Sequence, residues 1–205
     1  ASCVSKGILM GFYHFARKGS PEENAVNFYE ATKRYLYSGI MCLDMEDPPE
    51  PSEPIPHEEW GEYAQRFVDK FHSITGVFPL VYASASYLTL FNGYPFVDDC
   101  GLWVAGYPNG RGNKLTEPPN FCYDVSPFDF ASIWQFDEYG IVNGCNYDLD
   151  VNVAYMDAHA WRLYANPALA DGTGVIPTPV QAPDKDNKKW TFENSKVKVD
   201  IELKS

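Results

Sequence analysis

Long apolar runs are absent from this sequence. Nowhere do about 18 consecutive apolar residues occur, the minimum for a helix that crosses a bilayer. The opening residues 1–7 also lack the charged and then apolar pattern of a secretory signal peptide. On these grounds the sequence predicts no membrane partner.

Positive charge and metal-binding patterns are scarce as well. The 16 Lys and Arg residues are outnumbered by 28 Asp and Glu residues, which gives a net charge of -12. Because proteins bind the phosphates of nucleic acids through Lys and Arg, this balance argues against a nucleic-acid partner. The five cysteines show neither CxxC nor Cys/His metal spacing, so we expect no metal ion and no cofactor. Their odd number suits reduced thiols better than a complete disulfide framework.

Aromatic residues, by contrast, are abundant. Trp, Tyr and Phe number 5, 14 and 13, and hydrophobic residues make up 45% of the 205 residues. A chain of this length and composition can form one globular domain with a full core. Flat aromatic rings also suit the faces of sugar rings or nucleobases. The sequence therefore predicts a cleft lined by aromatic side chains.

The stretch from residue 40 to residue 48 is the most informative in the chain. The apolar residues 40–43 run into Asp44 and Glu46, and Pro48 ends the run. A short, continuous apolar segment predicts a strand buried on both faces of a parallel sheet. Side chains alternate along a strand, so Asp44 and Glu46 should point to the same side, where repulsion and loss of water would raise one pKa. The alternative is a pair of solvated loop acids at the strand end.

Hydrophobic periodicity predicts alternating strands and helices over residues 1–165. Strands are expected near residues 7–15, 40–46, 78–83, 101–106 and 131–136. Helices are expected over residues 20–39, 57–75, 85–91 and 154–164, the first with Ser20 as its N-cap and Pro21 at its first position. This order is typical of a parallel α/β fold. We expect residues 166–188 to form a proline-rich linker and residues 189–205 a short β tail that begins another, incomplete module.

Six short motifs occur at the ends of these strands, in one order along the chain. They are YHFAR (13–17), DME (44–46), VYAS (81–84), WVAGY (103–107), WQF (134–136) and DLD (148–150). Together they resemble glycoside hydrolase family 25, the N-acetylmuramidases or Chalaropsis-type lysozymes, over roughly residues 7–164. The resemblance implies an irregular, TIM-like β/α barrel, and such barrels carry their active sites at the C-terminal ends of the strands.

The resemblance also implies a reaction and the residues that carry it out. The family hydrolyses the β-1,4 bond between N-acetylmuramic acid and N-acetylglucosamine in bacterial peptidoglycan. By their places in the motifs, Glu46 matches the general acid, Asp44 its partner carboxylate and Asp148 a further acid of the pocket. Glycoside hydrolysis needs one carboxyl group to protonate the leaving oxygen and another to handle positive charge. The residues expected to bind the sugar are Tyr13, His14, Tyr82, Trp103, Tyr107 and Gln135.

Several of these assignments have structural alternatives. His14 on a buried strand can be a hydrogen-bonded core histidine, and the aromatic rings can simply pack in the core or at the rim. Asp148 can be a turn acid. The partner that the resemblance implies is the glycan strand of peptidoglycan, which a monomeric enzyme would meet outside the cell at the cell wall.

The start of the chain departs from the family pattern. The family begins with a strand that carries D-[VI]-S, followed by a helix and a second strand, and nothing similar precedes Gly7. We therefore expect a barrel that is incomplete at its N-terminus and lacks one pocket acid. Without that acid, a non-catalytic domain that binds wall carbohydrate is the alternative function. A chitinase-like barrel is a weaker third interpretation, because the WVAGY and DLD motifs argue against it.

Overall fold

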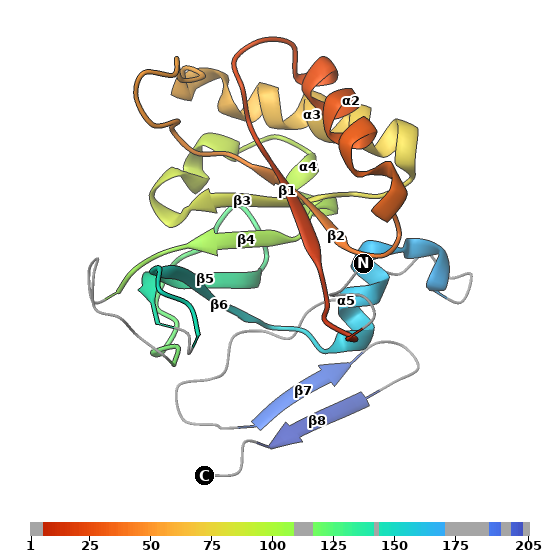
Figure 1. The fold of residues 1–205 in the computed structure, drawn as a ribbon, viewed down its shortest axis with the longest axis vertical. Helices are drawn as coiled ribbons and strands as arrows, with labels where there is room; N and C mark the ends of the chain where they lie inside the picture. Colours follow the sequence, from red (N-terminus) through yellow and green to blue (C-terminus); the bar gives the residue numbers. More distant parts are fainter. Residues whose placement is uncertain (1–5, 109–116, 142–143, 171–188, 194–197, 203–205) are drawn as a thin grey trace.

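The computed structural model describes residues 6–108, 117–141 and 144–170, together with the backbone of residues 189–193 and 198–202 (Figure 1). Within these residues, six strands follow one another in sequence order in one curled sheet. They are β1 (Gly11–Phe15), β2 (Ile40–Asp44), β3 (Leu80–Ser84), β4 (Leu102–Ala105), β5 (Ala131–Gly140) and β6 (Leu149–Ala154). Strands β1 to β5 are parallel, and β6 runs antiparallel to β5. The sheet is an open α/β half-barrel, which confirms the predicted fold class.

Helices connect β1 to β2, β2 to β3 and β3 to β4, and two more follow β6. The α-helices are α2 (Pro21–Thr32), α3 (Trp60–Thr75), α4 (Phe96–Asp99) and α5 (Ala158–Ala165), and the 3-10 helices are η1 (Lys33–Tyr35), η2 (His57–Glu59), η3 (Ala85–Phe91) and η4 (Pro167–Leu169). Helix α2 begins as the sequence predicts, because the Ser20 hydroxyl accepts a hydrogen bond from the backbone N–H of Glu23 at 3.2 Å. Helix α3 ends at Gly76, whose φ of 71° is a left-handed conformation that glycine adopts without strain. None of the helices in the described ranges is long and apolar enough to cross a membrane.

The two faces of the sheet have different neighbours. Helices α2 and α3 lie side by side over one face, which we call the outer face (Figure 1). Strand residues such as Leu43 and Val81 are buried there against Phe28 of α2 and against Phe67 and Phe71 of α3. The three phenylalanine rings contact one another with centroids 5.3, 6.1 and 6.4 Å apart. This layer is the main hydrophobic core.

The opposite, inner face is apolar only near the amino ends of its strands. Cys42, Leu80 and Ile133 form a second buried cluster there with Tyr164 and Ala165. The last two residues belong to α5, so this helix closes the amino end of the half-barrel. Nearer the carboxyl ends, the side chains of the inner face become polar.

Two elements differ from the sequence prediction. The helix expected over residues 154–164 begins only at Ala158, where the Asp157 side chain caps it, and residues 149–154 form a strand, β6, that the sequence does not predict. Val151 and Val153 alternate with polar residues, and their pairing with β5 makes this segment a strand. The β tail consists of two antiparallel strands, β7 (Lys189–Glu193) and β8 (Lys198–Glu202), rather than one. Residues 171–188 of the predicted linker lie outside the described part of the chain.

The outer core predicts a large effect of Phe67→Ala on stability. Phe67 is fully buried, and its ring packs against Phe28 and His14. Replacing a buried Phe by Ala lowers the free energy of unfolding by about 3–5 kcal/mol, through lost burial and the cavity that remains. Urea denaturation followed by circular dichroism should show a loss of this size. Val26→Ala on the exposed side of α2 is the control, expected to change it by less than about 0.5 kcal/mol.

Candidate active site

Strand register brings most of the predicted site residues onto the inner face. Asp44 on β2 pairs with Tyr82 on β3, and Tyr82 pairs with Trp103 on β4. Partner residues of neighbouring strands point to the same face, so these three side chains form one row. Gln135 on β5 joins the row through a hydrogen bond with Tyr82. Tyr13 lies on the same face of β1, since it pairs with an inward-facing residue of β2.

His14 points the other way, into the outer core. Its Nε2 lies 2.8 Å from Oδ1 of Asn24 on α2, and its ring stacks on Phe67 with centroids 5.4 Å apart. Burial lowers the pKa of His14, and the Asn24 hydrogen bond opposes this effect only in part. This geometry fits a structural histidine, and it separates His14 from the other residues expected to bind the sugar.

Asp44 is the last residue of β2 and is only 6% exposed. Loss of water, followed by the charges of Glu46 and Asp150, raises the pKa of Asp44 to about 8, and Arg17 opposes this in part. Its buried Oδ1 has no hydrogen-bond partner among the residues that the structure describes. The ionised carboxylate is therefore poorly stabilised, and a proton is retained at neutral pH.

Glu46 lies two residues beyond Asp44 and is half-buried, so it is the more accessible of the two carboxyl groups. Burial raises the pKa of Glu46, and the charges of Asp150, Asp47 and Glu138 raise it further. The charge of Glu46 acts in turn on Asp44, as expected for side chains on one side of a strand. The pKa values of both groups are raised, so each keeps its proton to a higher pH than an exposed carboxyl group does. Such a pair can supply a proton to a bound substrate.

Asp150 on β6 is an acid that sequence interpretation missed. Loss of water raises the pKa of Asp150, and its charge acts on Asp44 and Glu46. We call Asp44, Glu46 and Asp150 the acid cluster. Asp148, the predicted pocket acid, lies just before β6 with an exposed side chain, and its role stays a prediction. The available signal for Asp150 was the second acid of the same DLD motif.

A buried amide organises two tyrosines beside the acid cluster. Oε1 of Gln135 accepts hydrogen bonds from the hydroxyls of Tyr82 at 2.8 Å and Tyr107 at 2.6 Å. Gln135 itself is 4% exposed, so the geometry gives it an orienting role. Trp103 meets Tyr82 edge to face at 5.7 Å, and its Nε1 donates to Oδ1 of Asn152 on β6 at 2.8 Å. These contacts join β3, β4, β5 and β6 into one wall of the site.

A hollow of about 290 Å³ opens at the carboxyl ends of β3 and β4. Its lining consists of Ser84, Ala85, Ser86, Ala105, Gly106, Tyr107 and Tyr123. Gly106 lets the Tyr123 ring approach closely, because a Cβ at this position would lie 2.5 Å from that ring and displace it. Small residues between two aromatic rings leave a space that suits part of a sugar ring.

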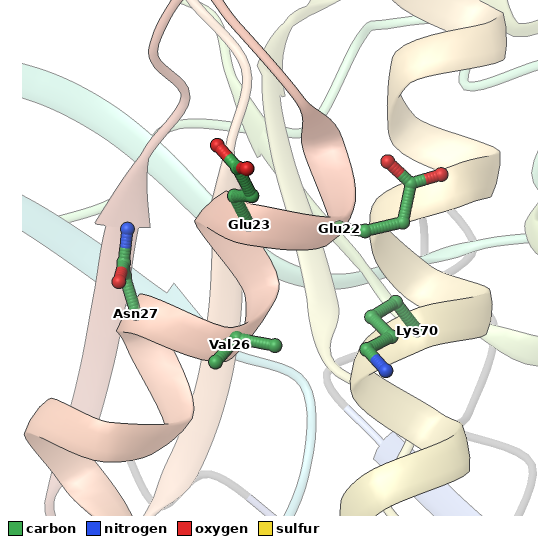
Figure 2. A pocket seen from close by; sticks show the side chains of 5 residues that line it. All are labelled: Glu22, Glu23, Val26, Asn27 and Lys70. Carbon is green, nitrogen blue, oxygen red and sulfur yellow. The ribbon is translucent and has the colours of Figure 1, made fainter.

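A second hollow, of about 420 Å³, lies on the helical layer and has different chemistry. Figure 2 shows its lining, which comes from Glu22, Glu23, Val26 and Asn27 of α2 and from Lys70 of α3. Glu22 is already engaged, since hydrogen bonds from the Arg66 guanidinium lower the pKa of Glu22 to about 2. No residue of the acid cluster lines this hollow, and we assign the candidate site to the inner face.

An open α/β barrel with desolvated carboxyl groups at the carboxyl end of a strand is the arrangement of a glycoside hydrolase. The family model described as glycosyl hydrolases family 25 matches residues 1–145. The chain therefore belongs to glycosyl hydrolase family 25, and it is a glycoside hydrolase.

Several solved structures share this fold at low sequence identity. A family 25 lysozyme from Aspergillus fumigatus is 22% identical with a TM-score of 0.59, and the match covers 80% of this chain and 76% of the lysozyme. The lysozyme from Streptomyces coelicolor is 21% identical with a TM-score of 0.60, covering 80% and 75%. A muramidase from Acremonium alcalophilum is 22% identical with a TM-score of 0.58, covering 80% and 76%. No curated protein sequence gives a significant match.

Burial of Asp44 predicts a distinctive pH dependence of stability. The pKa of Asp44 rises from 3.8 in an exposed carboxyl group to about 8 in the folded protein. The folded state therefore binds more protons than the unfolded state between these values, and stability falls as the pH rises through this window. Asp44→Asn has no proton to lose, so its Tm should fall less than that of the wild type between about pH 5 and pH 8.

The control for this comparison is Asp98→Asn, which changes an exposed acid on α4. Its Tm should follow that of the wild type at each pH. The burial argument would be refuted if Asp44→Asn and the wild type lost the same number of degrees over this pH range.

The tyrosine pair makes Gln135→Leu a test of the site wall. Leu cannot accept the hydrogen bonds from Tyr82 and Tyr107, and a buried polar group without a partner destabilises a protein by about 1–3 kcal/mol. Tyr107→Phe removes one donor only and should lower the free energy of unfolding by less than Gln135→Leu does. Urea denaturation measures the free energy of unfolding of both variants. A Gln135→Leu variant as stable as the wild type would contradict the role of Gln135 in orienting Tyr82 and Tyr107.

Proposed function

We propose that this chain hydrolyses the β-1,4 bond between N-acetylmuramic acid and N-acetylglucosamine in peptidoglycan, with Glu46 as the general acid. The observation that carries the proposal is the pair Asp44 and Glu46, whose pKa values are raised by burial at the carboxyl end of β2. Membership of family 25 and the shared fold of the lysozymes and muramidase support the substrate class.

Glu46 is suited to donate the proton because it is the more exposed member of the pair. A bound sugar would displace water from Glu46 and so raise its pKa further. Protonation of the glycosidic oxygen lets the C–O bond break while positive charge develops on the sugar. The negative charge that the Asp44 and Glu46 pair gains as this proton leaves it stabilises the positive charge on the sugar. Asp150 adds a third carboxyl group to the same field.

The sugar would lie against the aromatic wall of the inner face. Tyr107 lines the hollow beside β3 and β4, while Tyr82 and Trp103 form the row next to Asp44. Tyr13 is 66% exposed on the same face and offers a ring on which a sugar can pack. We assign Asp148 as a further acid at the approach to β6, next in the motif to Asp150.

The proposed substrate places the action of the chain outside the cell, on the glycan strands of the wall, and we expect it to act as a monomer. A net charge of -12 does not favour binding to polyanionic wall polymers. Recognition would therefore depend on the sugars, through the aromatic wall, rather than on charge.

Glu46→Gln tests the assignment of the acid. Gln keeps the shape of the side chain but cannot deliver a proton, so the rate should fall by about 10²–10⁴-fold. Release of reducing ends from purified peptidoglycan measures this rate, and mass spectrometry should find N-acetylmuramic acid at the new ends. Glu58→Gln on η2 changes an exposed acid and is the matched control, expected to keep the wild-type rate. A wild-type rate in Glu46→Gln would remove Glu46 from the mechanism.

The same assay separates an enzyme from a binding domain. A wild-type chain that sediments with insoluble peptidoglycan but releases no reducing ends would be the non-catalytic barrel. Chitin assayed in parallel tests the specificity, because it lacks N-acetylmuramic acid. Hydrolysis of peptidoglycan but not of chitin is the expected result.

A further inference from the structure

A small polar network stands directly beside the acid cluster, where the chain leaves β2. Asp47 follows Glu46, and both of its carboxylate oxygens lie 3.0 Å from Nε2 of His57. The hydroxyl of Tyr87 donates to Oδ2 of the same carboxylate at 3.3 Å. We call Asp47, His57 and Tyr87 the rim clamp. Its residues come from the loop after β2, from η2 and from η3.

The rim clamp rests on a buried tryptophan. Trp60, the first residue of α3, is 1% exposed, and its Nε1 donates to the backbone oxygen of Ile55 at 3.0 Å. The Trp60 ring meets His57 with centroids 5.0 Å apart and Tyr87 with centroids 5.1 Å apart. The rings of His57 and Tyr87 meet at 4.8 Å. Although its polar atoms face solvent, the clamp therefore has a packed base.

The clamp also holds a negative charge next to the proposed acid. Loss of water is the largest cause of the raised pKa of Glu46. The charges of Asp150, Asp47 and Glu138 come next, in that order. Of these acids, Asp47 is the one adjacent to Glu46 in sequence. The titratable and charged groups that meet in this part of the site are Asp44, Glu46, Asp47, Tyr82, Glu138 and Asp150, with Arg17 acting on Asp44 and His57 on Asp47.

We propose that Asp47 is a positioning residue for Glu46: the rim clamp fixes the chain next to Glu46 and places a negative charge beside its carboxyl group. This inference rests on the proposed role of Glu46 as the general acid. A negative neighbour favours the neutral form of an acid, so the clamp keeps the donated proton available at higher pH. If the clamp only tied the proline-rich loop to η2 and η3, the charge of Asp47 would not matter.

Substitutions of Asp47 separate the effect of its charge on Glu46 from the effect of its hydrogen bonds on the loop. Asp47→Asn keeps the size of the side chain and can still form hydrogen bonds, but it removes the charge. The alkaline limb of the pH–rate profile for peptidoglycan hydrolysis should therefore move to lower pH. Asp47→Glu restores the charge on a longer side chain and should return the limb towards its wild-type position. Equal displacement of the limb in both variants would overturn the proposal.

Two further variants change the clamp without removing the charge of Asp47. His57→Gln abolishes any positive charge on the imidazole and keeps a hydrogen-bond donor. Tyr87→Phe removes the hydroxyl and keeps the ring that packs on Trp60. Both should leave the alkaline limb much closer to the wild-type position than Asp47→Asn does. A limb that moved as far in these variants as in Asp47→Asn would mean that the clamp acts only through loop structure.

An NMR titration of the Glu46 carboxyl carbon tests the charge effect without substrate. Labelling with 13C-glutamate gives the signal, and its absence in Glu46→Gln assigns it. The pKa of Glu46 should be lower in Asp47→Asn than in the wild type and in Asp47→Glu. The Asp47 side chain is 44% exposed, so salt should screen it. Raising the ionic strength from about 0.1 M to 1 M shortens the Debye length from about 10 Å to about 3 Å. The difference in the pKa of Glu46 between the wild type and Asp47→Asn should therefore become smaller.

The two kinds of measurement keep this inference distinct from the proposed function. An unchanged pKa of Glu46 in Asp47→Asn would overturn the role of Asp47, even if Glu46→Gln abolished hydrolysis. A wild-type chain without hydrolytic activity would instead refute the proposed function, while a lowered pKa in Asp47→Asn would still show that Asp47 sets the charge around Glu46.

Discussion

The burial of one carboxyl group, that of Asp44, is the constraint on which the rest of the site depends. At 6% exposure, and with an oxygen that finds no hydrogen-bond partner in the described part of the chain, its ionised form is unfavourable. The neighbours increase this effect, because Glu46 and Asp150 are also acids and Arg17 offsets them only in part. Such a site does not stabilise the fold, so stability has to come from another part of the molecule.

The outer face of the same strand provides that stability. Leu43 and Met45, on either side of Asp44, are fully buried in the main core. Backbone hydrogen bonds continue past the strand end. The N–H of Ala16 donates to the backbone carbonyl oxygen of Asp44, and the N–H of Met45 donates to the backbone carbonyl oxygen of Tyr82, both at 2.9 Å. Because side chains alternate, the strand that presents the acid to the inner face is also anchored by its apolar neighbours on the outer face.

Local patterns explain what the sequence could predict, and long-range pairing explains what it could not. The buried strand before Asp44 and the common side of Asp44 and Glu46 depend on neighbours a few residues apart. The inner face cannot be identified from β1 alone, so the sequence groups His14 with the sugar-binding residues although it packs under α2 and α3. The place of Asp150 depends on the pairing of β6 with β5. The rim clamp joins Asp47 to residues ten and forty positions away, and no local pattern marks it.

The negative charge that the site can carry determines which kind of reaction it can catalyse. Acids that raise one another's pKa repel anionic ligands, and they favour a substrate that becomes positively charged as it reacts. A glycosidic bond meets this condition, because it is neutral in the bound sugar and oxocarbenium-like in the transition state. In the proposed mechanism, Glu46 gives up its proton and the acid cluster gains a negative charge at the moment when positive charge appears on the sugar. In this mechanism the positive charge of the substrate offsets the repulsion that the lost proton would otherwise create between Asp44, Glu46 and Asp150.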